Sequence, residues 1–363
     1  MSFELRKLED VCDILDHMRI PITSRDRKEG PYPYYGANGI QDYIDDFIFD
    51  DELVLLAEDG GNFGSKEKPI AYRISGKTWV NNHAHVLKPK NIIDIDYLCY
   101  SLMYYDVSGL VNGATRQKLT QSEMRKINIR YRSLEKQRQM VFKIKLISNI
   151  ISSREHQLSN LNLLVKSRFI EMFGLLLTQE KAVTLENLIS QNIITYHLDG
   201  NHGGLYPKAD EFVRTGVPYL GANAIIDGRI DFKKAKFLTE RKASILRKGI
   251  AQNGDVLFAH NATVGPVAIL KTDYKKVIVS TSLTVYRCNN RRILPVFIKY
   301  FMESEFFVNQ YKKDMKQTTR NQVPITHQKK FMFIVPPIEL QNQFADFVAQ
   351  VDKSKFVVTA KFQ

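Results

Sequence analysis

The chain has 363 residues, of which 44% are hydrophobic and 25% are charged, a composition that excludes a disordered or fibrous protein and has room for two or three domains. Lysine and arginine number 52 against 39 acidic residues, and the net charge of +13 favours a polyanionic partner such as nucleic acid. Three widely spaced cysteines exclude a disulfide framework, and neither an apolar leader nor a run of about 18 apolar residues occurs. We therefore expect a cytoplasmic protein that does not enter a membrane.

The first half of the chain contains a series of short helix and strand signals. KLEDV at residues 7 to 11 predicts a short helix, and PYYGANGI at 33 to 40 predicts an extended segment that enters a tight turn. DDELVLLAEDG (50 to 60) predicts a buried strand bounded by turns, and VNNHAHVLKP (80 to 89) predicts another strand. DYLCYSLMYYD (96 to 106) predicts the helix that follows.

The second half repeats these phrases in the same order. TLENL (184 to 188), PYLGANAI (218 to 225), NGDVLFAHNATVG (253 to 265), IVSTSLTVYR (278 to 287) and PVFIKYFMESE (295 to 305) correspond to the five earlier segments. One such match could arise by chance, but a collinear series indicates duplication. The period of roughly 180 to 200 residues fits a duplicated domain and excludes a solenoid, whose repeats are about 20 to 50 residues long.

The last match is the most regular. Residues 113 to 139 align without a gap with residues 317 to 343, at a constant offset of 204, and Arg116 falls on Arg320. The offsets of the other matches differ, so we expect insertions in the middle of the second copy. A shared framework with divergent middle segments is typical of a scaffold that presents variable recognition loops.

A long helix is predicted between the two copies, from about Leu134 to Met172, because this stretch lacks proline and glycine. Steps of four and three place apolar residues on one seam, typical of a coiled coil; they are Met140, Ile144, Ile147, Ile151, Leu158, Leu161 and Val165. The same offset places Phe344, Val348 and Val351 on a C-terminal helix, with a break at Lys355. The two helices are expected to pair antiparallel, which would hold two similar globular domains in a pseudo-twofold arrangement.

No catalytic site is evident in the sequence, and we expect no enzyme activity, no cofactor and no metal. The glycine-rich EDGGNFG (58 to 64) lacks the lysine and hydroxyl residue of a phosphate-binding loop. His83 and His85 are expected on one side of a strand, but no third metal ligand is spaced to join them, so a structural or DNA-contacting role is favoured.

Binding residues are more numerous, and they fall into three groups. The candidates for base readout are polar or basic residues of predicted loops: Lys66, Lys68, Asn81, Asn82 and His83 in the first copy and His260, Asn261, Thr263 and Thr281 in the second. The candidates for phosphate contact form a basic run: Lys233, Lys234, Lys236, Arg241 and Lys242. A third set recurs in both copies and is interpreted as scaffold or backbone contact: Arg116, Lys118, Arg320, Asn321 and Gln322.

The ordered phrases KLEDV and TLENL, PYYGANGI and PYLGANAI, GDVLFAHNATVG, and VPPIELQNQFADFV resemble the specificity subunit of type I restriction-modification systems over essentially the whole chain. The resemblance implies an α+β fold with duplicated mixed α/β target-recognition domains at residues 1–130 and 175–335. A central conserved helix (131–174) and a C-terminal helix (336–363) would form an antiparallel coiled coil. The C-terminal helix looks shortened, and both a natural origin and a trimmed chain are open.

The resemblance also implies partners. Each domain would read one half of a bipartite double-stranded DNA target, and the coiled coil would set the spacer. Two modification (methyltransferase) subunits would dock on the helices, and restriction subunits would join the full complex. Two alternatives stay open: a self-contained DNA methyltransferase or nuclease with duplicated recognition domains, and a non-catalytic adaptor.

Overall fold

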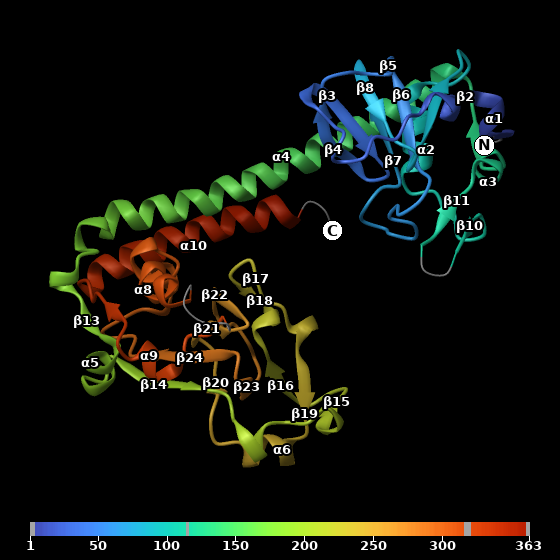
Figure 1. Cartoon of the computed structure of the whole chain (residues 1–363). Coiled ribbons are helices and arrows are strands. Elements are labelled where there is room, and N and C mark those ends of the chain that lie inside the picture. Colours follow the sequence, from blue (N-terminus) through green and yellow to red (C-terminus); the bar gives the residue numbers. More distant parts are fainter. Residues whose placement is uncertain (1–3, 114–115, 316–320, 361–363) are drawn as a thin grey trace. The chain divides into compact units, whose positions relative to one another are not determined.

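The computed structural model describes residues 4–113, 116–315 and 321–360. It divides into two compact units, Met1–Ser153 and Arg154–Gln363, and both combine small sheets with helices (Figure 1). None of the described helices is both long enough and apolar enough to cross a membrane.

The first unit contains three short helices and the first part of the long helix α4. The helices are α1 (Leu8–Val11), α2 (Ile95–Met103), α3 (Gln121–Arg125) and α4 (Leu134–Phe173). The strands are β1 (Glu4–Lys7), β2 (Cys12–Ile14), β3 (Glu29–Gly36), β4 (Gly39–Ile44), β5 (Phe49–Asp50), β6 (Leu53–Ala57), β7 (Ala71–Ile74), β8 (Lys77–Val80), β9 (Ala84–Pro89), β10 (Val111–Asn112), β11 (Lys118–Leu119) and β12 (Asn128–Tyr131).

The second unit contains the rest of α4 and a richer set of elements. The helices are α5 (Leu185–Ser190), α6 (Glu240–Ile245), α7 (Pro295–Met302), α8 (Glu305–Met315), α9 (Ile325–Gln328) and α10 (Ile338–Ala360). The strands are β13 (Val183–Thr184), β14 (Ile194–Asp199), β15 (Phe212–Val213), β16 (Val217–Leu220), β17 (Ile225–Ile226), β18 (Arg229–Ile230), β19 (Lys236–Leu238), β20 (Ile250–Ala251), β21 (Val256–Asn261), β22 (Thr263–Ile269), β23 (Val277–Val279), β24 (Leu283–Cys288) and β25 (Met332–Phe333).

The strand orders of the two units correspond. One sheet has the order β2-β9-β6-β7 in the first unit and β14-β24-β21-β22 in the second. The other has the order β4-β3-β8-β5 in the first unit, and β19-β16-β23-β20 repeats it with β15 added at the edge. The pair β1-β12 likewise corresponds to β13-β25. The predicted duplication is therefore confirmed, and the strands β15, β17 and β18 and the helix α6 are additions in the middle of the second copy, where insertions are expected.

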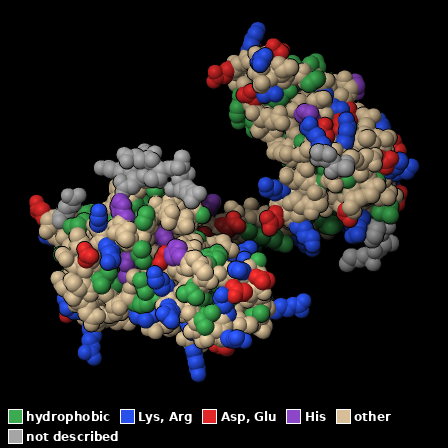
Figure 2. Space-filling view, turned by 60° about the horizontal axis from the view of Figure 1, so that its bottom comes forward, with side chains coloured by type: hydrophobic (Ala, Val, Ile, Leu, Met, Phe, Trp, Pro, Cys, Tyr) green, Lys and Arg blue, Asp and Glu red, His purple; other side chains and the backbone are tan. Residues whose placement is uncertain are grey.

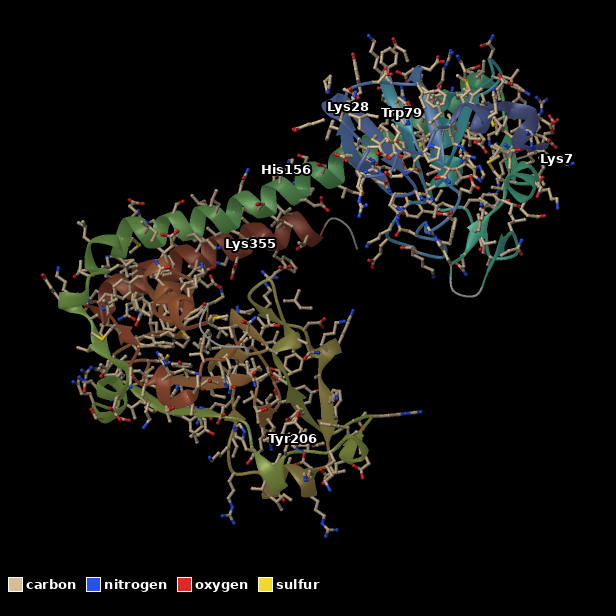
Figure 3. The ribbon with its side chains drawn as sticks, in the orientation of Figure 1. Lys7, Lys28, Trp79, His156, Tyr206 and Lys355 are labelled. Carbon is tan, nitrogen blue, oxygen red and sulfur yellow. The ribbon has the colours of Figure 1, made fainter. Side chains whose placement is uncertain are left out.

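The repeated phrase occupies the same place in both units. Tyr34 of β3 pairs in parallel with Trp79 of β8, and Tyr219 of β16 pairs in parallel with Ile278 of β23. Trp79, labelled in Figure 3, also donates from Nε1 to the Ile20 carbonyl at 2.6 Å. The phrase is thus a framework strand that enters a turn, as its proline and glycine predict.

The apolar segments that the sequence singles out form the two cores. In β6 all five residues, LVLLA, are buried, as the uninterrupted apolar run predicts for an interior strand. The helices α2 and α7 bury their apolar faces against these equivalent sheets. The two predicted helix starts, KLEDV and TLENL, are α1 and α5.

Within the second unit, α10 packs against the last part of α4 and runs in the opposite direction (Figure 1). The rings of Phe169 and Phe344 lie 5.5 Å apart, and those of Phe173 and Phe344 lie 5.6 Å apart. The start of α10 therefore meets the end of α4. Val165, Val348 and Val351, which the seam predicts, are buried in the same core.

Over the first part of α4, which belongs to the first unit, the predicted seam stays a prediction. Met140, Ile147 and Ile151 are 39%, 56% and 43% exposed, and Ile144, Leu158 and Leu161 are partly exposed. The buried positions near the C-terminal end are Val165, Phe169 and Phe173, spaced four residues apart. Leu161, which the alternating steps select, also packs against this core, so the end of α4 combines seam positions with a four-residue ridge.

Candidate nucleic-acid interface

Equivalent turns precede β9 and β24 in the two units. In the first, the Asn81 side-chain oxygen accepts a hydrogen bond from the His83 amide at 2.8 Å. In the second, the Ser280 hydroxyl accepts one from the Ser282 amide at 3.2 Å. A side-chain oxygen that accepts from an amide two residues later stabilises a tight turn. The two units therefore present the middle residue of each turn in the same way.

Asn81 is a support for this turn, which corrects its assignment as a base reader. It is 3% exposed, and its Nδ2 donates to Gln41 Oε1 at 3.0 Å while its oxygen holds the turn. The adjacent Asn82 is exposed, and its side chain forms no hydrogen bond with a described residue. The polar side chain of this turn that is available to a ligand is therefore that of Asn82.

The first turn is also held from behind by Arg19 and Glu58. The Arg19 guanidinium donates to the Ala84 carbonyl at 2.8 Å and to Glu58 at 2.6 Å. The Glu58 amide donates to the His83 carbonyl at 2.9 Å. The equivalent amide of the second unit, that of His260, donates to Ser282 at 3.0 Å. These bonds fix the backbone from which residue 82 projects.

Beside the turn, the Asp59 carboxylate contacts a histidine and an arginine side chain. Its Oδ1 lies 2.7 Å from His83 Nδ1 and 2.7 Å from Arg116 Nη2. The Arg116 side chain is 63% exposed and that of His83 34%, so both groups reach solvent. Figure 2 shows basic, acidic and histidine side chains gathered on this face of the first unit. Arg116 therefore presents an oriented guanidinium next to the turn.

The recurring loops are tied to the sheets at equivalent points. Lys118 bridges to Asp59, and Gln322 bridges to Asn261, as isolated antiparallel pairs. Lys118 also lies 3.0 Å from Glu58 Oε1, with its side chain half exposed. In the second unit, the Asn321 carbonyl accepts from the Ala262 amide at 3.0 Å. These contacts support the interpretation of the loops as scaffold. Arg320, the remaining candidate of this set, lies outside the described residues.

The turn and the loop of the first unit border a hollow of about 380 Å³. It is lined by Pro21, Ile22, Thr23, Arg27, Tyr34, Gln41, Asn81, Asn82, His83 and Arg116. The structure thus brings together four of the residues that the sequence selects. It adds Arg27, whose guanidinium stacks 4.3 Å from the Tyr34 ring centre, and Gln41 from the hairpin of β3 and β4. In the sequence, the only signal for this hairpin was the turn predicted from the repeated phrase PYYGANGI.

Three buried side chains behind the turn lie close enough to share a metal ion. The ligand atoms of Asp16, Glu58 and His85 are all within 4.8 Å of one another. However, the ring nitrogens of His85 are already engaged, one 2.6 Å from Asp16 and the other 2.9 Å from the Leu119 carbonyl. Arg19 supplies the compensating positive charge. The group is therefore a satisfied ion-pair network that joins strand ends.

The electrostatics of this network are set by Asp16. Burial would raise its pKa, but the hydrogen bonds from His85 and Val86 and the charge of Arg19 hold the pKa below its usual value. His83 does not join the network, because it precedes β9 and faces Asp59. The expectation that His83 and His85 project together from one strand is therefore wrong.

His260 of the second unit is buried, which corrects its assignment as a base reader. It is 1% exposed, and its Nδ1 lies 2.9 Å from the Thr284 hydroxyl. Burial lowers its pKa, so the neutral ring is favoured. The first five residues of β21, Val256 to His260, are all buried, a detail that the position of His260 in a polar HNAT phrase conceals.

Gln328 completes the polar network around His260. Its Nε2 donates to Thr284 and to the Val323 carbonyl, both at 3.0 Å. Its Oε1 accepts from the Tyr286 hydroxyl at 2.7 Å and lies 3.2 Å from His197 Nε2. The amide is therefore fully satisfied in the core. Burial lowers the pKa of His197 to about 4, so this ring is also neutral at pH 7.

The other candidates of the second unit lie at the surface. Thr281 is the middle residue of the turn, and Asn261 and Thr263 flank the tip of the β21–β22 hairpin, where Ala262 has a φ of 64°. Asn321 and Gln322 are exposed beside it. In the first unit, Lys66 and Lys68 are exposed on a loop outside the lining of the hollow. All remain predicted contacts.

The basic run is largely accessible. Lys233, Lys234, Lys236 and Arg241 are exposed, and Figure 2 shows basic side chains that project from this unit. Lys242 differs, because its amine lies 2.6 Å from Glu211 and its side chain is only 14% exposed. Its assignment to phosphate contact is therefore corrected to a structural ion pair.

Comparison with known proteins identifies the family. Residues 2–163 and 198–361 each match the family described as Type I restriction modification DNA specificity domain. The chain belongs to this family, and each match covers most of one copy of the fold.

Individual relatives agree with this membership. A candidate type I restriction enzyme specificity subunit of Haemophilus influenzae is 36% identical over 138 residues, which are 38% of this chain and 35% of that protein. This chain thus aligns with only about a third of the length of the first two curated relatives: 35% of the Haemophilus protein and 34% of the MjaX specificity subunit of Methanocaldococcus jannaschii. The MjaVIII specificity subunit of Methanocaldococcus jannaschii is 22% identical over 97% of this chain and 86% of its own.

Solved structures share the fold. The type I restriction-modification S subunit of M. genitalium superposes with a TM-score of 0.58 at 13% identity, over 99% of this chain and 92% of that one. A chain from a study of type I system assembly and conformational transition gives a TM-score of 0.52 at 14% identity, over 99% and 91%. At these identities the likeness concerns the fold alone.

Proposed function

We propose that this chain is the DNA-specificity subunit of a type I restriction-modification complex and acts on DNA in the cytoplasm. One recognition domain, residues 1–130, reads one half of a bipartite duplex, and the other, 175–335, reads the second half. The helices at 131–174 and 336–363 set the spacer. Methyl transfer and cleavage belong to separate modification and restriction subunits.

The observation that carries this proposal is the pair of equivalent turns with different residues at their tips. The framework around residues 81–83 and 280–282 is the same, but the middle residue is the exposed Asn82 in one unit and the partly exposed Thr281 in the other. A repeated scaffold with different polar groups at one surface position suits recognition of two different half-sites.

The exposed part of α4 supports the docking of modification subunits. Phe142, Leu146 and Ile150 are 67%, 50% and 44% exposed, and their four-residue spacing places them along one face of the helix. A contiguous apolar stripe on a helix surface favours a protein partner. We propose that two modification subunits bind this helical region and the adjoining faces of the domains.

The test is to express the chain with its modification subunit and to sequence the methylated bases in host DNA. A bipartite motif with a fixed gap, absent when the chain is omitted, is the expected result. Methylation without a bipartite motif, or methylation that is independent of this chain, would overturn the proposal.

A further inference from the structure

We propose that Asn82 reads an adenine in the half-site of the first unit and that Thr281 holds the equivalent reading position in the second. This inference rests on the proposed function and deepens it, because it names one base and the residue that selects it.

The Asn82 side chain makes no hydrogen bond within the described part of the chain, while the backbone of its turn is held in place. Asn81 is engaged with Gln41 and the His83 amide, and the turn carbonyls are held by Arg19 and Glu58. Asn82 lines the hollow, is exposed, and makes no side-chain hydrogen bond with a described residue. A side chain on a fixed backbone with unsatisfied polar groups is preorganised for a ligand.

The amide of Asn82 has the chemistry to recognise adenine. Asn82 offers one donor and one acceptor side by side, which matches N7 and the N6 amino group of adenine in the major groove. Guanine presents two acceptors at the corresponding edge, so an amide can satisfy only one of them. The neighbouring Arg116 guanidinium is oriented by Asp59 and carries the charge that suits phosphate. Among the neutral amides that line the hollow, Asn82 has both its donor and its acceptor available, whereas Asn81 and Gln41 bond to each other.

The equivalent turn of the second unit carries a different residue at the same position. Thr281 follows Ser280 in the second turn as Asn82 follows Asn81 in the first. In both turns the carbonyl of the last residue accepts a hydrogen bond from an equivalent backbone amide. Threonine offers a hydroxyl and a methyl group and lacks a bidentate pair, so its base preference differs. The two half-sites are therefore expected to differ at corresponding positions.

The experiment uses the complex of this chain with its modification subunit. Asn82→Ala and the near-isosteric Asn82→Asp are compared with wild type by sequencing methylated host DNA and by binding to duplexes that carry each base in turn. Both variants should lose discrimination at a single adenine of one half-site, by about ten-fold to a hundred-fold, with the other half unchanged. Thr281→Ala should change one position of the other half only.

The matched control is Asn91→Ala, at an exposed asparagine of the same unit outside the hollow, which should leave the motif unchanged. Thermal unfolding of each variant distinguishes loss of readout from loss of structure. An unchanged motif in a folded Asn82→Ala complex, a change at a base other than adenine, or a change in both halves would overturn the inference while leaving the proposed function intact. If wild type itself gives no bipartite motif, the proposed function fails first.

Discussion

Gln137 and Gln341 perform the same task at the starts of α4 and α10. Both are fully buried. Gln137 accepts from the Asp94 amide at 2.8 Å and donates to the Ile92 and Arg132 carbonyls. Gln341 accepts from the Leu294 amide at 2.9 Å and donates to the Arg292 and Pro336 carbonyls. Each amide thus joins the beginning of a helix to the segment before α2 or α7.

Replacing Gln341 with leucine should destabilise the second unit by about 3 kcal/mol, because buried backbone groups lose their partners. The measurement is the free energy of unfolding in urea. Gln343→Leu is the control, since residue 343 is exposed on the same helix and should change stability by less than about 0.5 kcal/mol. Equal effects of the two substitutions would contradict this role for Gln341.

The glutamine pair illustrates what the sequence could predict. The ungapped offset of 204 placed Gln137 on Gln341, and the duplicated strands and helices followed from the same matches. The sequence matches did not predict the direction in which individual side chains point. His260 and Asn81 lie in polar phrases that look like exposed loops, yet one points inward from a strand and the other closes a turn. Arg27 and Gln41 join the site only because β3 and β4 fold back on each other.

Replacing Arg116 with alanine should weaken binding of the complex to all duplexes by a similar factor. Its guanidinium is exposed and oriented by Asp59, and its loop recurs in both units, which favours a phosphate contact. The slope of log K against log salt concentration should fall by about 1. Fluorescence anisotropy at several salt concentrations measures both quantities, with Lys88→Ala, which removes an amine paired to Asp51, as the control. A loss confined to one base pair would instead indicate base readout.

Stability of the second unit should decrease on acidification. His197 has a folded pKa of about 4 because of burial, whereas an unfolded histidine titrates near about 6.5. The unfolded chain therefore binds a proton first as the pH falls, so stability present above about pH 6.5 is lost progressively down to about pH 4, by up to about 3 kcal/mol. His197→Asn should flatten this dependence in urea unfolding at pH 7 and 5. His156→Asn, at the exposed histidine of α4 labelled in Figure 3, should not.

Replacing Phe169 with alanine should cost about 3 to 5 kcal/mol of stability, because the ring is 2% exposed and packs against Phe173, Phe297 and Phe344. The next residue of the helix gives a direct control. Ile170 is 52% exposed, and Ile170→Ala should change stability by less than about 0.5 kcal/mol. If both substitutions had the same effect on urea unfolding, the four-residue ridge would not be the packing surface between α4 and α10.

Inserting seven residues after Ser152 should lengthen the spacer of the target and leave both half-sites unchanged. The insertion point is exposed and precedes the part of α4 that packs against α10. Seven helical residues add about 10.5 Å and nearly two full turns, so the faces of the helix keep their relative orientation. At about 3.4 Å per base pair, the gap should grow by about three base pairs. A two-residue insertion adds only about 3 Å but rotates the helix by about 200°, and it should abolish recognition of any bipartite site. Sequencing of methylated host DNA measures both outcomes, and an unchanged gap after the seven-residue insertion would exclude α4 as the element that sets the spacer.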